Sequence, residues 1–349
     1  MSTSTVTPMK PWAATPRDRA MTLTSVLLAA LTTFAIVAST PMKGKIAYFF
    51  VFFITWLAID SVFVLRKSGS KGVRNGLAEK LAFFGAFMVL MAVSSILWSV
   101  ISRGVAGLNF KYFTETMRNA SMFDPIGNGG IAHAIFGTLL LITIAIIISV
   151  PMGILTALYL TEIKGKAAKF IEFLIQAMAG VPSVVAGLFI YAAIILNTPL
   201  RPSAFLGGLA LTILMVPTVT RTAQEILNLV PQDLREAGLA MGATQWKTVA
   251  LVVVPAARSG LITAVILGVA RIAGETAPLL FTVGVFDAFN FNPFVGQNSA
   301  LPVIIWSGLN GGAEESIQRA WSAIFVLLVV VLVIFVSARI FGKKSMKNV

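Results

Sequence analysis

The sequence predicts an all-α polytopic membrane protein with about eight transmembrane helices. Of its 349 residues, 57% are hydrophobic and 12% are charged, whereas a soluble domain has about 25% charged residues. The apolar residues gather in long runs, and a helix needs about 20 of them to cross a bilayer. The net charge of +13 lies in short segments between these runs. That distribution favours membrane topology, with lipid as a partner, over nucleic-acid binding.

The predicted spans follow one another from residue 21 to residue 341. A short apolar piece at 301–309 cannot span and is expected to form a re-entrant or surface helix. Residues 1–20 form a tail, residues 21–80 a hairpin with a basic linker, and residues 81–349 the main body. The spans are expected at 21–39, 46–65, 81–101, 133–160, 170–196, 206–226, 261–286 and 321–341.

Lys and Arg residues concentrate in alternate connections, which predicts that both termini lie in the cytoplasm. These connections are 66–80, 161–169, 227–260 and the C-terminal tail. Lys43 and Lys45, between the first two spans, are an exception. The first span could also be a signal peptide, but its apolar run is longer than such peptides carry and a second span follows closely, which favours an uncleaved anchor.

The residue types present exclude several kinds of chemistry. The chain has no cysteine and one histidine, His133, so disulfides, thiol catalysis and multi-histidine metal sites are excluded. The phosphate-binding pattern Gly-x-x-x-x-Gly-Lys-Ser/Thr is absent from the sequence. We therefore expect no catalytic residue, no metal and no cofactor bound by this chain, and a membrane enzyme is disfavoured.

A polar, helix-forming segment at 228–258 interrupts the apolar runs. Pro231 suits a helix start, Gly242 suits a left-handed helix end, and Thr244 suits the cap of a second helix. Pro255 is expected to end that second helix or to start the next segment. The pattern predicts two short helices joined at a glycine, which would form either an ordinary amphipathic loop or a compact docking element.

The spacing of Glu236, Ala237, Gly242 and Pro255 resembles the EAA loop of bacterial ABC-importer permeases. In that family the loop docks into a groove on the ATPase. Gly238 stands where the family usually has Ala, and glycine inside a helix costs about 1 kcal/mol relative to alanine. We expect this change to weaken the helix and to keep the docking surface.

Charged residues inside the predicted spans are candidates for function. Arg271 and Glu275 lie near the middle of the seventh span, and their i, i+4 spacing predicts that they share one helix face. They could form a self-neutralising pair, or Glu275 could hold Arg271 for an oxyanion, whose geometry suits a guanidinium. Arg221 and Glu225 form a second such pair, which could simply reach the interface. Asp60 has no obvious partner.

One helix break is visible, at Gly180-Val181-Pro182-Ser183 in the fifth span. Proline removes a backbone hydrogen bond, and a membrane helix tolerates this only where protein or water satisfies the freed groups. Pro182 and Ser183 could line a pathway or form a plain packing kink. Secondary transporters often have paired breaks in repeated halves, so a single break argues against that class.

The segment from Arg271 to Thr282 is similar to the signature of the A-type permeases of phosphate-specific ABC importers. Residues 137–140, 180–183 and 217–222 are also similar, and the resemblance covers about residue 81 to the C-terminus. It implies a type I ABC-importer permease core of six helices in the bacterial inner membrane. It also implies that Arg221, Arg271 and Glu275 serve phosphate passage; we add Thr276, Pro182 and Ser183.

The same resemblance implies several partners. These are a second, related permease, two copies of a cytoplasmic ATPase that binds ATP and Mg²⁺, and an extracytoplasmic phosphate-binding protein. Residues 1–80 do not match the family, and we expect their hairpin to face lipid. Two other functions stay open, namely a permease of the same superfamily for another substrate, such as molybdate, sulfate or a sugar, and an ATP-independent secondary transporter.

Overall fold

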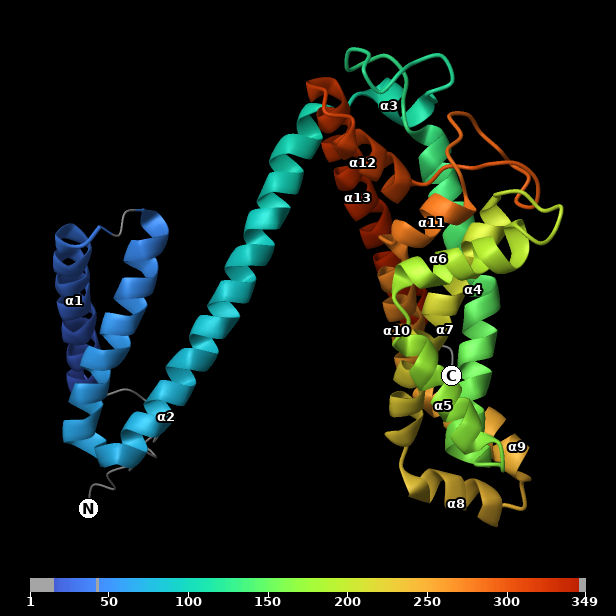
Figure 1. The fold of residues 1–349 in the computed structure, drawn as a ribbon. Coiled ribbons are helices and arrows are strands. Elements are labelled where there is room, and N and C mark those ends of the chain that lie inside the picture. Colours follow the sequence, from blue (N-terminus) through green and yellow to red (C-terminus); the bar gives the residue numbers. More distant parts are fainter. Residues whose placement is uncertain (1–15, 42–43, 345–349) are drawn as a thin grey trace, which may run out of the picture. The chain divides into compact units, whose positions relative to one another are not determined.

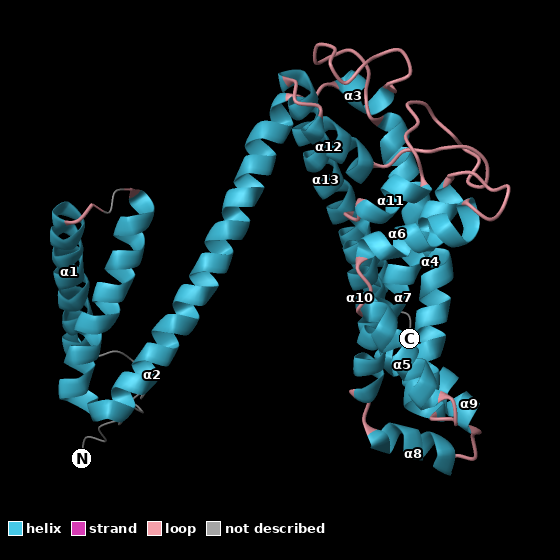
Figure 2. Ribbon diagram, viewed as in Figure 1, coloured by secondary structure: helices cyan, strands magenta, loops and turns pink. Residues whose placement is uncertain are grey.

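The computed structural model describes residues 16–41 and 44–344, which form helices and connecting loops (Figures 1 and 2). The chain divides into two compact units, Met1–Ile96 and Leu97–Val349. No strand occurs in the described residues, so the predicted all-α fold class is confirmed. Residues 1–15 of the predicted tail 1–20, together with Lys43, lie outside the described residues.

Unit 1 contains α1 (Pro16–Ser39) and most of α2 (Lys45–Ala106). The 62 residues of α2 would extend about 93 Å if straight, about three bilayer cores. The helix is instead broken at Gly69, whose φ of 67° is left-handed, and the second arm reverses direction there and diverges from the first (Figure 1). The arms pack through stacked Phe53 and Phe84 rings, 3.7 Å apart. They hold the second and third predicted spans.

Asp60 in the first arm of α2 has two polar partners. Its carboxylate accepts a hydrogen bond from the Ser25 hydroxyl of α1 at 3.2 Å and forms an ion pair with Lys80 of the second arm. The expectation that Asp60 lacks a partner is therefore wrong. The sequence hides the pair because 20 residues separate its members, and only the reversal at Gly69 brings them together.

Unit 2 is built around α7 (Ala204–Asn228), whose residues are largely buried. It packs against α4 (Ala132–Leu158) and α10 (Val254–Ala273). A Cβ on Gly153 of α4 or on Gly268 of α10 would lie 2.8 Å from the Val219 side chain of α7. Glycines on both neighbours therefore allow the close backbone approach that is typical of packed membrane helices.

The remaining elements of unit 2 lie around this core. α8 and α9 lie at one end of the unit and α3 at the other (Figure 1). The elements are α3 (Phe110–Thr114), α5 (Ala168–Ala179), α6 (Ser183–Ile190), α8 (Gln232–Ala240), α9 (Gln245–Thr248), α11 (Ala277–Thr282), α12 (Leu301–Asn310), α13 (Glu314–Lys344) and the π-helical turns η1 (Tyr159–Ile163), η2 (Tyr191–Ile195) and η3 (Val249–Val253).

By length and composition, six helices of the described chain could cross a membrane, and a bent pair makes seven if taken as one span. Since α2 holds two predicted spans, every predicted span overlaps one of these helices. The short apolar piece forms the ten-residue helix α12, and its placement as a re-entrant or surface helix stays a prediction.

Two predicted spans differ from the structure. The fifth is not one kinked helix, since α5 and the α6–η2 helix meet at 103°. The seventh starts earlier, at Gln245, and ends at Ala273. Beyond it, Gly274 interrupts the helix and Pro278 sits in the first turn of the six-residue α11. The chain therefore has a second break, at 274–276, that the sequence pattern did not reveal.

Candidate functional site

The loop between α7 and α10, which we call the α8–α9 loop (residues 229–248), has the predicted shape. α8 starts directly after Pro231, with Asp233 in its first turn, where negative charge suits the helix dipole. Gly242 follows the helix with φ +80°, a left-handed value that glycine adopts at little cost. Thr244 precedes α9, but its side chain makes no capping bond. Two helices joined at a glycine are confirmed.

The outer surface of the α8–α9 loop is exposed to solvent. Glu236, Ala237 and Gly242 are exposed, and so are the large apolar side chains Met241 (87%) and Trp246 (62%). An exposed apolar patch rimmed by polar residues is typical of a protein–protein contact. This surface can therefore accept a partner.

Gly238 has a packing role that the sequence did not indicate. A Cβ at this position would lie 2.7 Å from the Thr248 Cγ2 atom. Glycine therefore lets α8 lie close against α9. The expectation that Gly238 only weakens the helix is incomplete, because an alanine here would push the two helices apart.

Pro255 does not end a helix. A continuous helix runs from Gln245 to Ala273, with η3 just before the proline. Proline has no N–H and its ring crowds the carbonyl four residues earlier. An α-helical turn before Pro255 would place a carbonyl against the proline ring, and the chain has the wider π-helical turn η3 at this point instead. Pro255 therefore marks where the loop passes into the long helix.

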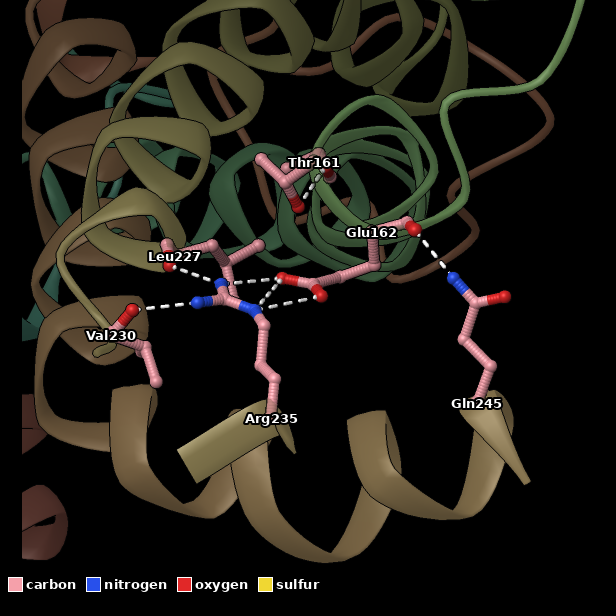
Figure 3. A network of polar contacts seen from close by, with 7 residues as sticks. Thr161, Glu162, Leu227, Val230, Arg235 and Gln245 are labelled. Carbon is pink, nitrogen blue, oxygen red and sulfur yellow. Dashed lines mark hydrogen bonds and ion pairs between the residues drawn. The ribbon is translucent and has the colours of Figure 1, made fainter. Parts of the chain in front are cut away.

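An ion pair fastens the α8–α9 loop to the rest of unit 2 (Figure 3). The Arg235 guanidinium of α8 donates from Nη2 and Nε to the two Glu162 carboxylate oxygens of η1 at 2.7 and 3.0 Å. It also donates to the carbonyls of Leu227 and Val230 at 2.8 and 2.6 Å. The Gln245 amide of α9 donates to the Glu162 carbonyl at 2.6 Å. Three segments of the chain meet at Glu162.

The Arg235–Glu162 pair is partly buried. Side-chain exposure is 16% for Arg235 and 7% for Glu162, and a cavity of about 470 Å³ lies beside them. The hydrogen bonds to Glu162 raise the pKa of Arg235 above its usual value. Arg235 therefore stays ionised at all physiological pH values.

The two helix breaks lie in elements that pack together. A Cβ on Gly187 of α6 would lie 2.5 Å from the Pro278 Cα of α11, and the Tyr191 and Phe281 rings are 6.5 Å apart. From the first contact to the second, the residue number rises in both segments, so the two segments pack in parallel. The starts of α6 and α11 therefore lie at the same end of the pair, with Pro182 before α6 and Ser183 as its first residue, and with Glu275 and Thr276 before α11. Ser183, Glu275 and Thr276 are half-buried and Pro182 is exposed.

Arg271 and Glu275 do not share a helix face. Arg271 lies in the last turn of α10 and Glu275 lies beyond its end at Gly274, so the predicted i, i+4 geometry is wrong. Ion pairs among the described side chains join Lys80 to Asp60, Lys111 to Glu115 and Arg235 to Glu162. Neither Arg271 with Glu275 nor Arg221 with Glu225 is among them. Arg271, Arg221 and Glu225 are exposed in this chain.

Arg271 and Arg221 lie at different levels of the bundle. Gly268 of α10 packs against Met215 and Val219 of α7, and Gly260 against Ile226, so the two helices run antiparallel. Arg271, one turn beyond Gly268, therefore lies level with the middle of α7. Arg221 lies closer to the α8–α9 loop, offset by about 10 Å at 1.5 Å per residue.

Comparison with known proteins identifies the family. Residues 149–347 match the family described as binding-protein-dependent transport system inner membrane component. The chain belongs to this family. It is 36% identical over 268 residues to the phosphate transport system permease protein PstA 1 of Mycobacterium tuberculosis H37Rv, covering 76% of this chain and 86% of the relative. It is 35% identical over 279 residues to PstA of Pasteurella multocida, covering 79% and 96%.

Among solved structures, the chain resembles an inward-facing MetNI methionine ABC transporter. The TM-score is 0.46 and the identity 18%, over 63% of this chain and 94% of that one.

In this inner membrane component, the sequence singled out the exposed residues of the α8–α9 loop and missed its anchor. Arg235 lies in the connection 227–260, where its charge predicts only topology, and Glu162 carries no predicted role. The available signal was Glu162 itself, an acidic residue at the end of a span followed by Lys164, Lys166 and Lys169. Its partner lies 73 residues further along the chain, which sequence spacing cannot connect.

Proposed function

We propose that this chain is a permease subunit of an ATP-driven importer for inorganic phosphate. The observation that carries the proposal is the 36% identity over 268 residues to the phosphate transport system permease of Mycobacterium tuberculosis. The relatives support phosphate as the proposed substrate, and the family supports a transport mode that depends on a binding protein. This chain itself has no catalytic residue in the proposal, since ATP and Mg²⁺ bind to a partner.

The α8–α9 loop is the coupling element in this proposal, and from here we call it the coupling loop. Glu236, Ala237 and Gly242, with exposed Met241 and Trp246, would contact a cytoplasmic ATPase, two copies of which serve this chain and a second, related permease. The end of unit 2 that carries α8 then faces the cytoplasm, as do both termini. The end that carries α3 faces an extracytoplasmic phosphate-binding protein.

The substrate pathway is proposed to run past the two helix breaks. Arg271 and Arg221 would offset the loss of hydration of the anion, since a guanidinium matches phosphate oxygens well. Glu275, Thr276, Pro182 and Ser183 lie at the breaks before α11 and α6. Without an ion pair to Glu275, Arg271 keeps its donors for an anion, while the nearby carboxylate keeps binding weak enough for release.

Alternating access follows from this arrangement. Closure of the ATPases on ATP would move the coupling loop, which continues through Pro255 into the helix that ends at Ala273, two residues after Arg271. Displacement of the loop would therefore tilt the helix that carries the anion site. In this way ATP binding would open the breaks toward the binding protein.

A secondary transporter is the main competing function. The number of breaks no longer argues against it, because the structure has two. The feature that separates the classes is the exposed coupling loop, which an ATP-independent carrier does not need. Permeases for another oxyanion would share both features and differ only in substrate.

Reconstitution tests the proposal. The chain would be coexpressed with the proteins encoded beside it, reconstituted in proteoliposomes, and assayed for uptake of labelled phosphate, sulfate and molybdate with and without ATP. We expect ATP-dependent uptake that is selective for phosphate. ATP-dependent uptake of another anion would overturn the substrate, and uptake independent of ATP would overturn the importer.

A further inference from the structure

We propose that the ion pair between Arg235 and Glu162 is a second connection, beside the continuous helix Gln245–Ala273, through which the coupling loop moves the membrane helices. This inference rests on the proposed function and adds a separation of tasks within the loop. The exposed surface binds the partner, whereas Arg235, Glu162 and Gln245 transmit the movement. Glu162 is then a positioning residue that contacts neither the ATPase nor the anion.

The two faces of α8 support this division. No residue of α8 is buried, and seven of its nine positions are exposed. Only Arg235 and Gly238 are half-buried, and their i, i+3 spacing places them on the same face. Gly238 contacts α9, which belongs to the same loop. Arg235 is therefore the side chain through which α8 makes its hydrogen bonds to the helices above it.

The contacts of Arg235 reach two long helices at once. Glu162 lies in η1 at the end of the continuous helix Ala132–Ile163, and Leu227 lies in the last turn of α7. The Leu227 carbonyl already accepts from the Val230 backbone N–H at 3.2 Å, so Arg235 adds a second, charged donor at the end of α7. Because both charged side chains are mostly shielded from solvent, breaking the pair leaves an uncompensated charge.

Gln245 makes the connection two-sided. Its amide donates from α9 to the Glu162 carbonyl at 2.6 Å, while Arg235 holds the Glu162 carboxylate from α8. The two helices of the loop are therefore fixed to one residue from both sides of Gly242. A loop held at two points moves as one body with Glu162, whereas a loop held at one point can pivot.

The test separates docking from transmission. Glu162→Gln and Arg235→Gln would be studied in the assembled importer, with Glu172→Gln and Arg258→Gln as matched controls at exposed positions. Three quantities are measured: copurification of the ATPase subunit, ATP hydrolysis, and phosphate taken up per ATP hydrolysed. Hydrogen exchange of residues 232–241 gives a fourth readout that does not depend on activity.

We expect the ATPase subunit to copurify with both variants, and phosphate uptake per ATP to fall by roughly tenfold or more, since charged hydrogen bonds are among the strongest single contacts. Exchange of α8 amides should rise in both variants and stay unchanged in the controls. The double variant Glu162→Gln/Arg235→Gln leaves no unpaired charge, so it should fold even where a single variant does not and should still transport poorly.

Two outcomes would overturn the inference. One is an unchanged ratio of phosphate to ATP in a folded variant, and the other is loss of copurification, which would make the pair part of docking. The unaltered chain separates these failures from failure of the proposed function, because absence of ATP-dependent uptake there would overturn the importer itself.

Discussion

Tyr112 and Arg319 hold the loop between α3 and α4 to the start of α13. The Arg319 Nη2 atom donates to the carbonyls of Asp124, Pro125 and Asn128 at 3.1, 2.9 and 2.7 Å. The Tyr112 hydroxyl donates to the Arg319 carbonyl at 2.7 Å. Both side chains are almost fully buried. A charged side chain at the centre of the loop gives this end of unit 2 a fixed shape.

Burial raises the pKa of Tyr112 above its ordinary value, which is about 10. The folded protein therefore keeps the Tyr112 proton at a pH where the unfolded chain loses it, so the contribution of Tyr112 to stability is complete below about pH 10 and is lost as pH rises further. We expect the absorbance difference between the unaltered protein and Tyr112→Phe to titrate well above pH 10 when folded and near pH 10 after denaturation. Titration near pH 10 in the folded protein would contradict the buried position.

Arg271 offers a test of the proposed anion site. Replacing Arg271 with Gln removes the charge and should lower phosphate uptake by roughly tenfold or more, because a hydrogen bond to a charged group contributes about 1.5–3 kcal/mol. Phosphate uptake by Arg271→Lys should lie between that of the unaltered chain and that of Arg271→Gln, since lysine keeps the charge but lacks the planar fork of hydrogen-bond donors. Arg258→Gln, on the same helix, is the matched control. Equal uptake by Arg271→Gln and the control would remove Arg271 from the pathway.

At the scale of elements, the contact between α8 and α9 reverses an expectation from helix propensity. Alanine favours a helix over glycine by about 1 kcal/mol, but a Cβ at position 238 meets Thr248 Cγ2. We expect Gly238→Ala to lower the thermal stability of the ATPase complex. Adding Thr248→Ser removes that methyl group and should restore stability. A stabilising effect of Gly238→Ala alone would show that the two helices separate easily.

The sequence predicted elements wherever the signal was local. Hydrophobic runs located the spans, and Gly242 located the turn between α8 and α9, because a left-handed residue is a property of one position. The sequence failed where two distant segments decide the outcome. The pairs Asp60–Lys80 and Arg235–Glu162 depend on how helices reverse, and the end of α10 at Gly274 depends on packing of α11 against α6. The assumption of a regular helix then produced a pair of Arg271 with Glu275 that the structure does not contain.

At the scale of the whole molecule, the division into two units predicts that the hairpin can be removed. The last turns of α2 belong to unit 2, where the Ser322 hydroxyl donates to the Gly104 carbonyl at 2.9 Å. A chain without residues 2–80 keeps these turns and the whole of unit 2. We expect it to insert, to copurify with the ATPase subunit, and to support phosphate uptake comparable to that of the full chain in the same proteoliposome assay. Loss of copurification would assign the hairpin a part in assembly.

The Asp60–Lys80 pair also has a consequence for biogenesis. A charged residue inside a membrane helix is costly to insert, and Asp60 lies inside the second predicted span (46–65), whereas Lys80 lies in the connection just before the third. The ribosome makes Lys80 20 residues after Asp60, so the first arm of α2 is exposed to that cost until the second arm has emerged. The two arms are therefore most stable when they enter the bilayer together, as a preformed hairpin whose charges already neutralise each other.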